Sequence, residues 1–182
     1  MTIGELWVLF PIILTAHSED WKEWYLEEEK RLSELLSDRN AVINHIGSTA
    51  INGIWAKPII DILVEIPKSD SMDAVKTALT QGGYICMSES RGRKSFNRGY
   101  TENGFAERVF HLHPRYFGDN DELYFRDYMN ENPELAKQYE ELKLSLWKSY
   151  EHDRDGYTDA KTAFGAEQTA RAKAAYSGRY CR

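Results

Sequence analysis

Apolar residues recur along this chain with two different periods, and each change of period marks a boundary between predicted elements. From residue 18 to about 37, Trp21, Trp24, Leu32 and Leu36 follow helical spacing, with Ser18 placed to cap the first turn. Short apolar runs with period two, bounded by turn residues, indicate strands instead. We therefore predict strands over residues 41–46, 59–66, 84–87 and 105–113, and helices over 18–37, 70–81, 122–130, 133–150 and 157–176.

The most apolar run covers residues 6–14 and is predicted to be a buried first strand, interrupted by Pro11 at an edge or bulge. It is too short to cross a bilayer, which needs about 20 residues. Glu5 precedes it without any Lys or Arg, so it does not have the basic leader of a secretory signal. We expect no membrane association.

A long polar stretch, residues 88–104, follows the third predicted strand. Stretches of this length without secondary structure are usually functional loops or disordered segments. We interpret it as a loop that is either mobile and solvated or closes over an anionic ligand, hinged at Gly92 and Gly99. Its basic residues are Arg91, Arg93, Lys94 and Arg98.

The strand predicted over 59–66 has two unlike faces. One side carries only apolar residues, and the other carries Asp61, Leu63 and Glu65. An unpartnered carboxylate is costly to bury, so we expect Asp61 to hold a ligand, a metal or neighbouring backbone. Glu65 is expected to be exposed at the strand end, and the glutamates at 27–29 to form a solvated helix face.

Composition and charge narrow the class of protein. With 42% hydrophobic and 29% charged residues, the 182-residue chain fits one soluble α/β domain spanning 1–182. Its formal net charge of −6 argues against a partner such as long nucleic acid. Cys86 and Cys181 form no close pair, so we interpret them as reduced thiols of a cytoplasmic protein. The oligomeric state is left open.

Several motifs occur in a fixed order, and together they suggest a family. They are His45-Ile46-Gly47-Ser48-Thr49, Lys57-Pro58-Ile59-Ile60-Asp61-Ile62, His111-Leu112-His113, Phe125-Arg126-Asp127-Tyr128, Tyr139 with Leu142-Lys143, and Tyr157 with Lys161. In this combination the chain resembles the GrpB-like family, a branch of the nucleotidyltransferase superfamily with a polymerase-beta-type fold. The resemblance covers almost the whole chain. It implies an α/β (α+β) fold: a small mixed sheet, flanking helices and a helical C-terminal section.

The resemblance also implies a site, with one departure from the superfamily pattern. In active nucleotidyltransferases a Gly-Ser turn holds the triphosphate, and two acids separated by one residue bind two divalent ions. Two such ions about 4 Å apart stabilise both the attacking and the leaving oxygen. Asp61 matches the first acid, but Leu63 stands at the second position and cannot bind metal. A third carboxylate is expected from Glu107 on the fourth predicted strand.

The candidate site residues follow from the motifs, and each has a plainer alternative. Catalytic candidates are Asp61 and Glu107; phosphate-binding candidates are His45, Gly47, Ser48, Lys57, Arg126, Lys143 and Lys161; metal-ligand candidates are Asp61, His111 and His113. His111 and His113 project from one face of a strand and suit a divalent metal (Mg, Mn or Zn), or are simply packed histidines. The helical cations either line a cleft or pair on the surface with Asp127, Glu140 and Asp159.

Two functions from different classes remain at this stage. The first is a nucleotidyltransferase-like protein that binds a nucleotide or another phosphorylated small molecule with a divalent metal, with nucleotidyl transfer as its activity. The second is a non-catalytic binding module that kept the fold and lost the two-metal site, which Leu63 favours.

Overall fold

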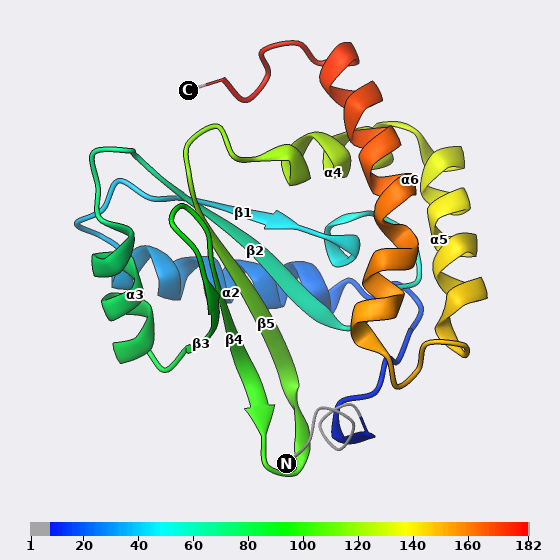
Figure 1. Cartoon of the computed structure of the whole chain (residues 1–182), viewed down its shortest axis with the longest axis horizontal. Helices are drawn as coiled ribbons and strands as arrows, with labels where there is room; N and C mark the ends of the chain where they lie inside the picture. The colour runs from blue at the N-terminus through cyan, green and yellow to red at the C-terminus, as the bar shows by residue number, and fades with distance from the viewer. Residues whose placement is uncertain (1–7, 182) are drawn as a thin grey trace.

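The computed structural model describes residues 8–181, and within this range five strands form one mixed sheet (Figure 1). The strands are β1 (Val42–Ile46), β2 (Ile59–Ile66), β3 (Ile85–Glu89), β4 (Lys94–Thr101) and β5 (Gly104–Tyr116). Their order is β1-β2-β5-β4-β3, with β2 and β5 parallel and the other neighbours antiparallel. The predicted mixed α/β layout is confirmed.

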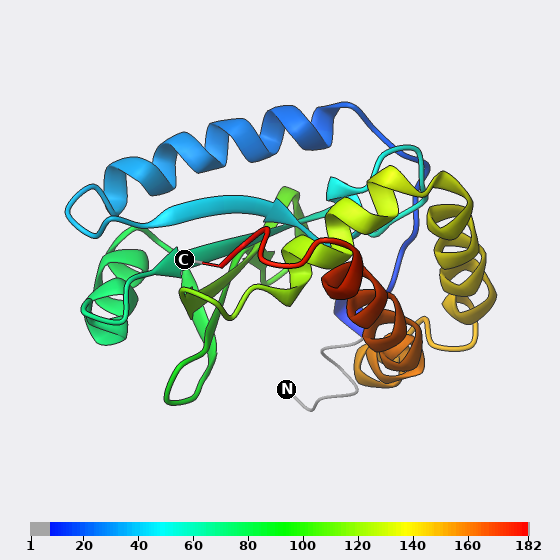
Figure 2. The same cartoon turned by 90° about the horizontal axis from the view of Figure 1, so that it is seen from above.

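Helices lie on both sides of the sheet. The helices are α2 (Asp20–Leu35), α3 (Met72–Gln81), α4 (Asp121–Glu131), α5 (Pro133–Trp147) and α6 (Arg154–Ala175), with a 3₁₀ turn η1 (Ser48–Ala50) after β1. Figure 2 shows α2 along one side of the sheet and α4 and α6 on the other. Local interactions determine where two of these helices begin. Pro133 is the first residue of α5, and the Asp153 side chain caps α6 by accepting a hydrogen bond from the Gly156 N–H.

The two faces predicted for residues 59–66 are confirmed. Ile60, Ile62, Val64 and Ile66 are buried in the main core with apolar residues of α2 and α3. On the opposite face, Leu63 packs with Ile46 and Leu123, which attaches α4 to the sheet. The C-terminal helices therefore stand beside the face that carries Asp61.

The strand predicted over residues 6–14 is wrong for its described part, residues 8–14; residues 6 and 7 lie outside the described range. Phe10, Ile12 and Leu14 are buried as alternation requires, yet no named strand includes them. The segment is attached to α5 instead, because Trp147 Nε1 donates to the Ile12 carbonyl at 2.7 Å. Its apolar pattern reflects packing against helices.

The loop predicted over residues 88–104 is also wrong. Residues 94–101 form β4, which pairs with β3 and β5 inside the sheet. Its charged side chains are paired: Lys94 lies 3.1 Å from Asp73 on α3 and 2.9 Å from Glu89 on the neighbouring strand β3, and Arg98 pairs with Glu28 on α2. A lid made of these residues is thereby excluded.

Two glutamates expected in solvent are buried. Glu65 is 1% exposed and accepts from Asn120 Nδ2 at 2.9 Å. Glu28, 3% exposed, accepts from Arg98 Nε at 3.0 Å and from the Tyr84 hydroxyl. Each prediction was wrong because the partner comes from a distant element. Across residues 8–181, no helix is long and apolar enough to cross a membrane.

Replacing Arg98 should destabilise the fold far more than replacing an exposed arginine. In Arg98→Met, the buried Glu28 carboxyl loses its cationic partner, which costs about 3 kcal/mol. The matched control is Arg108→Met, whose partner Glu27 is 65% exposed and whose loss costs below about 1 kcal/mol. Urea unfolding of both variants measures the difference. Equal losses would contradict the buried role of Glu28.

Candidate functional site

Asp61 faces the Gly47–Ser48 turn. In the β1–β2 ladder Ile46 is opposite Asp61, so the chain leaves β1 beside this carboxylate. Gly47 has φ 72°, and a Cβ at this position would lie 2.6 Å from Asp61 Oδ2. Only glycine satisfies both the left-handed backbone and the close approach of the carboxylate.

Two histidines hold the other oxygen of the same carboxylate. The parallel register places His111 beside Asp61 and His113 beside Leu63. Their nitrogens lie close to Asp61 Oδ1: His113 Nε2 at 3.1 Å and His111 Nδ1 at 3.5 Å. The predicted convergence of Asp61, His111 and His113 is therefore present in the structure.

Protonation of this cluster follows from burial and hydrogen bonding. Burial alone would raise the pKa of Asp61, but hydrogen bonds from His111 and His113 outweigh it and hold the pKa well below its usual range. Burial lowers the pKa of His111 and raises that of Tyr100, so both are neutral near pH 7. The Tyr100 hydroxyl, 2.8 Å from His111 Nε2, then donates to it, which leaves the Nδ1 proton facing Asp61.

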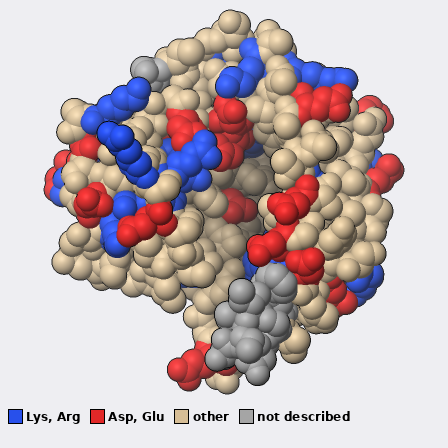
Figure 3. Space-filling model, in the orientation of Figure 1, with Lys and Arg blue, Asp and Glu red and all other residues tan. Residues whose placement is uncertain are grey.

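A cavity of about 380 Å³ opens in front of this cluster, between the sheet and the C-terminal helices. Figure 3 shows the face in view hollowed near its centre. Besides Asp61 and the two histidines, the lining includes Gly47, Ser48, Lys57, Tyr139, Lys143, Arg154, Tyr157 and Lys161. Although the chain carries net negative charge, basic side chains from α5, α6 and the segment before β2 meet in this cavity.

The lysines of the cavity are held in unusual environments. Lys143 is buried, and its Nζ donates to the Trp55 carbonyl, while Glu140 accepts from the Trp55 N–H at 2.7 Å. Lys161 and Lys57 lie over the Tyr157 ring, at 4.1 and 5.5 Å from its centroid. Instead of pairing with each other on the surface as expected, Lys143 and Glu140 both hydrogen-bond to the backbone of Trp55.

Burial lowers the pKa of each of these lysines, and neighbouring cations lower those of Lys57 and Lys143 further. The pKa of Lys57 falls to about 7 because of burial and then the charges of Lys161 and Arg154. The same causes, burial followed by Lys161, lower the pKa of Lys143 to about 7, and burial lowers that of Lys161 to about 8. Clustered cations of this kind are stabilised when an anion enters.

Some predicted site residues lie elsewhere. His45 points to the opposite side of the sheet, where its ring stacks on Tyr25 with centroids 4.7 Å apart, and burial lowers its pKa to about 4. Its Nε2 lies 2.9 Å from Thr49 Oγ1, which donates to the Ile59 carbonyl. His45 therefore stabilises the segment after the Gly47–Ser48 turn through Thr49, from the side of the sheet opposite the cavity. Arg126 donates to the His45 carbonyl at 2.9 Å and pairs with Asp127 at 2.8 Å.

Glu107 does not reach Asp61 either. It is exposed and lines a smaller, neighbouring hollow further along β5. Arg154 and Tyr100, in contrast, belong to the site but were not predicted. Arg154 is the first residue of α6. Tyr100 lies on β4, which was predicted to be a loop because its sequence is polar.

A metal site fits this residue set only in part. Leu63 is fully buried against Ile46 and Leu123, so no second carboxylate is available for a pair of ions. Among residues 8–181, no group of three or more His, Cys, Asp or Glu side chains has metal-binding geometry. Two imidazoles and one carboxylate are nonetheless the donor types that a single zinc-like ion prefers.

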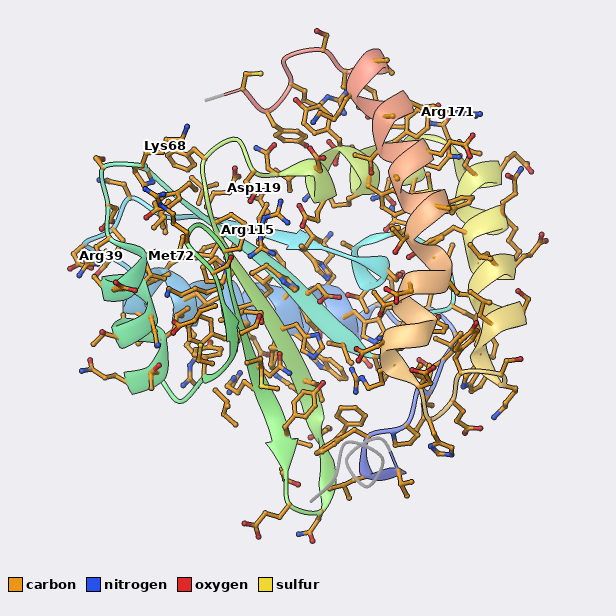
Figure 4. The ribbon with its side chains drawn as sticks, in the orientation of Figure 1. Arg39, Lys68, Met72, Arg115, Asp119 and Arg171 are labelled. Carbon is orange, nitrogen blue, oxygen red and sulfur yellow. The ribbon has the colours of Figure 1, made fainter. Side chains whose placement is uncertain are left out.

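A larger hollow, of about 640 Å³, lies at the other end of β2 and β5. Figure 4 labels Lys68 and Asp119 on its lining, with Arg115 beside them. Asp119 already accepts from Arg93 at 2.5 and 2.7 Å and lies 3.8 Å from Arg115 Nε. Asp119 offsets only part of the positive charge that Lys68, Arg91 and Arg93 bring to this hollow, but the lining contains no buried lysine like those of the Asp61 cavity, so it is the weaker candidate.

The fold is shared with a polymerase of known structure. The chain aligns with the Cid1 poly(U) polymerase in its MgGTP-bound structure with a TM-score of 0.51 and 14% identity, over 78% of this chain and 44% of that one, which shows a shared fold. Residues 11–171 match the family model described as GrpB protein, so the chain belongs to the GrpB family. The resemblance inferred from the motifs is confirmed.

Two relatives match over most of their length. The glutamate-rich protein GrpB of Alkalihalophilus pseudofirmus is 37% identical over 160 residues, covering 84% of this chain and 91% of the relative. The crystal structure of the conserved protein GrpB from Enterococcus faecalis aligns with a TM-score of 0.77 and 30% identity, over 90% of this chain and 99% of that one.

Substituting Gly47 should be costlier than substituting another glycine with the same backbone angle. Gly53 has φ 73° and open space around it, so Gly53→Ala costs only the left-handed penalty of about 1 kcal/mol. Gly47→Ala adds a collision with Asp61 worth about 1–3 kcal/mol more. Denaturant unfolding measures both variants. Equal losses would show that the Asp61 contact is unimportant.

The lysines predict a pH dependence of stability. The pKa of Lys143 is near 10.5 when unfolded and about 7 when folded, so between these values the unfolded chain binds more protons. The contribution of Lys143 to the free energy of unfolding therefore rises with pH across this window. Measured at several pH values, the free energy of unfolding should change less with pH in Lys143→Met than in wild type. Parallel profiles would contradict a lowered pKa.

Proposed function

We propose that the cavity binds the phosphate groups of a nucleotide or another phosphorylated small molecule. The observation that carries this proposal is the convergence of Lys57, Lys143, Arg154 and Lys161 on one cavity that also contains the Gly47–Ser48 turn. Cavities with a few convergent charged groups are the usual sites of small ligands. The nucleotide in the Cid1 structure, which shares the fold, agrees with this class of ligand.

Electrostatics give the proposal a characteristic signature. With pKa values of about 7 and 8, Lys143 and Lys161 are partly deprotonated near neutral pH. A phosphate group favours their charged forms, so binding takes up protons and raises both pKa values. Affinity for the anion should consequently fall as the pH rises through this range.

A divalent cation is a separate part of the proposal. Asp61, His111 and His113 would supply the ligands for one Mg, Mn or Zn ion after a rearrangement, because their side chains now hydrogen-bond to one another and do not have metal-binding geometry. The ion's chemistry would be to neutralise phosphate charge. The arrangement of two ions bridged by paired acids lacks its second ligand at Leu63. In this site the lysines would supply the charge compensation that a second ion provides elsewhere.

Nucleotidyl transfer is the second candidate function. The placement of Asp61 against the Gly47 turn favours it, because this is the position that the resemblance assigns to the first catalytic acid. Leu63 and the distant Glu107 favour binding without turnover. Incubation with nucleoside triphosphates and an assay for released pyrophosphate distinguishes the two functions.

Replacing a cavity lysine should abolish ligand-induced stabilisation. A ligand at 100 times its Kd stabilises the folded state by about 2.7 kcal/mol. We expect nucleoside triphosphates, with and without Mg, Mn or Zn, to raise the Tm of wild type and not of Lys161→Met. The matched control on the same helix is Lys173→Met, whose lysine is 51% exposed and pairs with Asp121. It should respond like wild type.

Two results would overturn the proposal. One is an unchanged wild-type Tm with every nucleotide and metal. The other is an equal response of wild type and Lys161→Met, which would place the bound ligand outside the cavity.

A further inference from the structure

A second hollow continues the cavity along the same face of the sheet. It measures about 170 Å³ and is lined mainly by apolar side chains: Pro11, Ile13, Pro58, Ile59, Phe105 and Val109. Lys57 and Ile59 belong to the lining of both spaces. The two hollows therefore meet at Lys57.

The strand register fixes how the two spaces are related. Ile59 pairs with Val109, and two residues later Asp61 pairs with His111 on the same face. A two-residue step along a strand is roughly 7 Å. The apolar hollow thus begins one such step from the carboxylate, a separation that leaves room for a sugar between a phosphate and a ring.

The outer wall of this hollow is held in place by backbone hydrogen bonds. Ile12 N donates to the Glu151 carbonyl at 2.8 Å, and its carbonyl accepts from Trp147. Because neighbouring side chains alternate in this extended segment, burying Ile12 turns Pro11 and Ile13 toward the hollow. The wall is fixed before any ligand arrives, as in most small-molecule sites.

Size and charge both suit a planar ring. A cavity of about 150 Å³ accepts benzene, so a hollow of 170 Å³ takes one ring system at its open edge. Lys57 stands at the boundary with the cationic cavity, and the Glu107 carboxylate lines the hollow on β5. The Glu107 carboxylate repels phosphate from the apolar hollow and can accept hydrogen bonds from ring N–H groups, while Lys57 attracts phosphate toward the cationic cavity.

We propose that this hollow receives the nucleobase of a nucleotide whose phosphates occupy the lysine-lined cavity. The inference rests on the proposed function and extends it: the ligand is a nucleotide, and its ring is held by apolar contact beside Lys57. Ile13, which is 46% exposed, becomes covered when the ring is bound.

Calorimetric titration of the full chain with inorganic triphosphate and, separately, with ATP, GTP, CTP and UTP tests this arrangement. At least one nucleotide should bind about tenfold or more tightly than inorganic triphosphate, which corresponds to 1.4 kcal/mol. Ile13→Asp should remove this advantage and leave the Kd for inorganic triphosphate unchanged.

The matched control is Met87→Asp, since Met87 is 55% exposed on β3 and lies outside both hollows. It should keep the wild-type ratio of affinities, and unchanged Tm values confirm that both variants fold. Two results would overturn the inference and leave the proposed function standing. One is equal binding of inorganic triphosphate and all four nucleotides to wild type. The other is a tighter binding of nucleotide that persists in Ile13→Asp. Failure of every probe to bind wild type overturns both.

Discussion

The site depends on one ionised carboxylate, which lies against a glycine turn and two histidines. Asp61 has Gly47 against one oxygen and His111 and His113 against the other, with Tyr100 fixing the outer nitrogen of His111. A buried carboxylate without such partners would be expensive. The strand pairing, the glycine turn and the histidine spacing are all arranged so that this charge is satisfied while it still faces the cavity.

The cationic side of the cavity has the opposite character. Lys57, Lys143 and Lys161 stand near one another and near Arg154, and burial weakens their hold on protons. Such an arrangement lowers stability in the free protein. In a chain of net charge −6, these four cations nevertheless gather on the lining of one cavity.

Local patterns in the sequence predicted the parts of the site that depend on local geometry. The alternation in residues 59–66 gave the two faces of β2, and the spacing of His111 and His113 placed both beside Asp61. Contacts between residues far apart in the chain could not be predicted from the sequence. We predicted a loop where β4 lies because its sequence is polar, and the sequence did not show that Glu28 and Glu89 pair with its charges. The side of the sheet to which His45 points depends on the strand register and on Tyr25. Arg154 has no local signal at all.

The grip of α5 on Trp55 has a consequence for motion. Glu140 and Lys143, three residues apart on one helix, take the N–H and the carbonyl of the same residue. Residues 52–56 and α5 should therefore move as a unit, and with them the chain that enters β2 at Lys57.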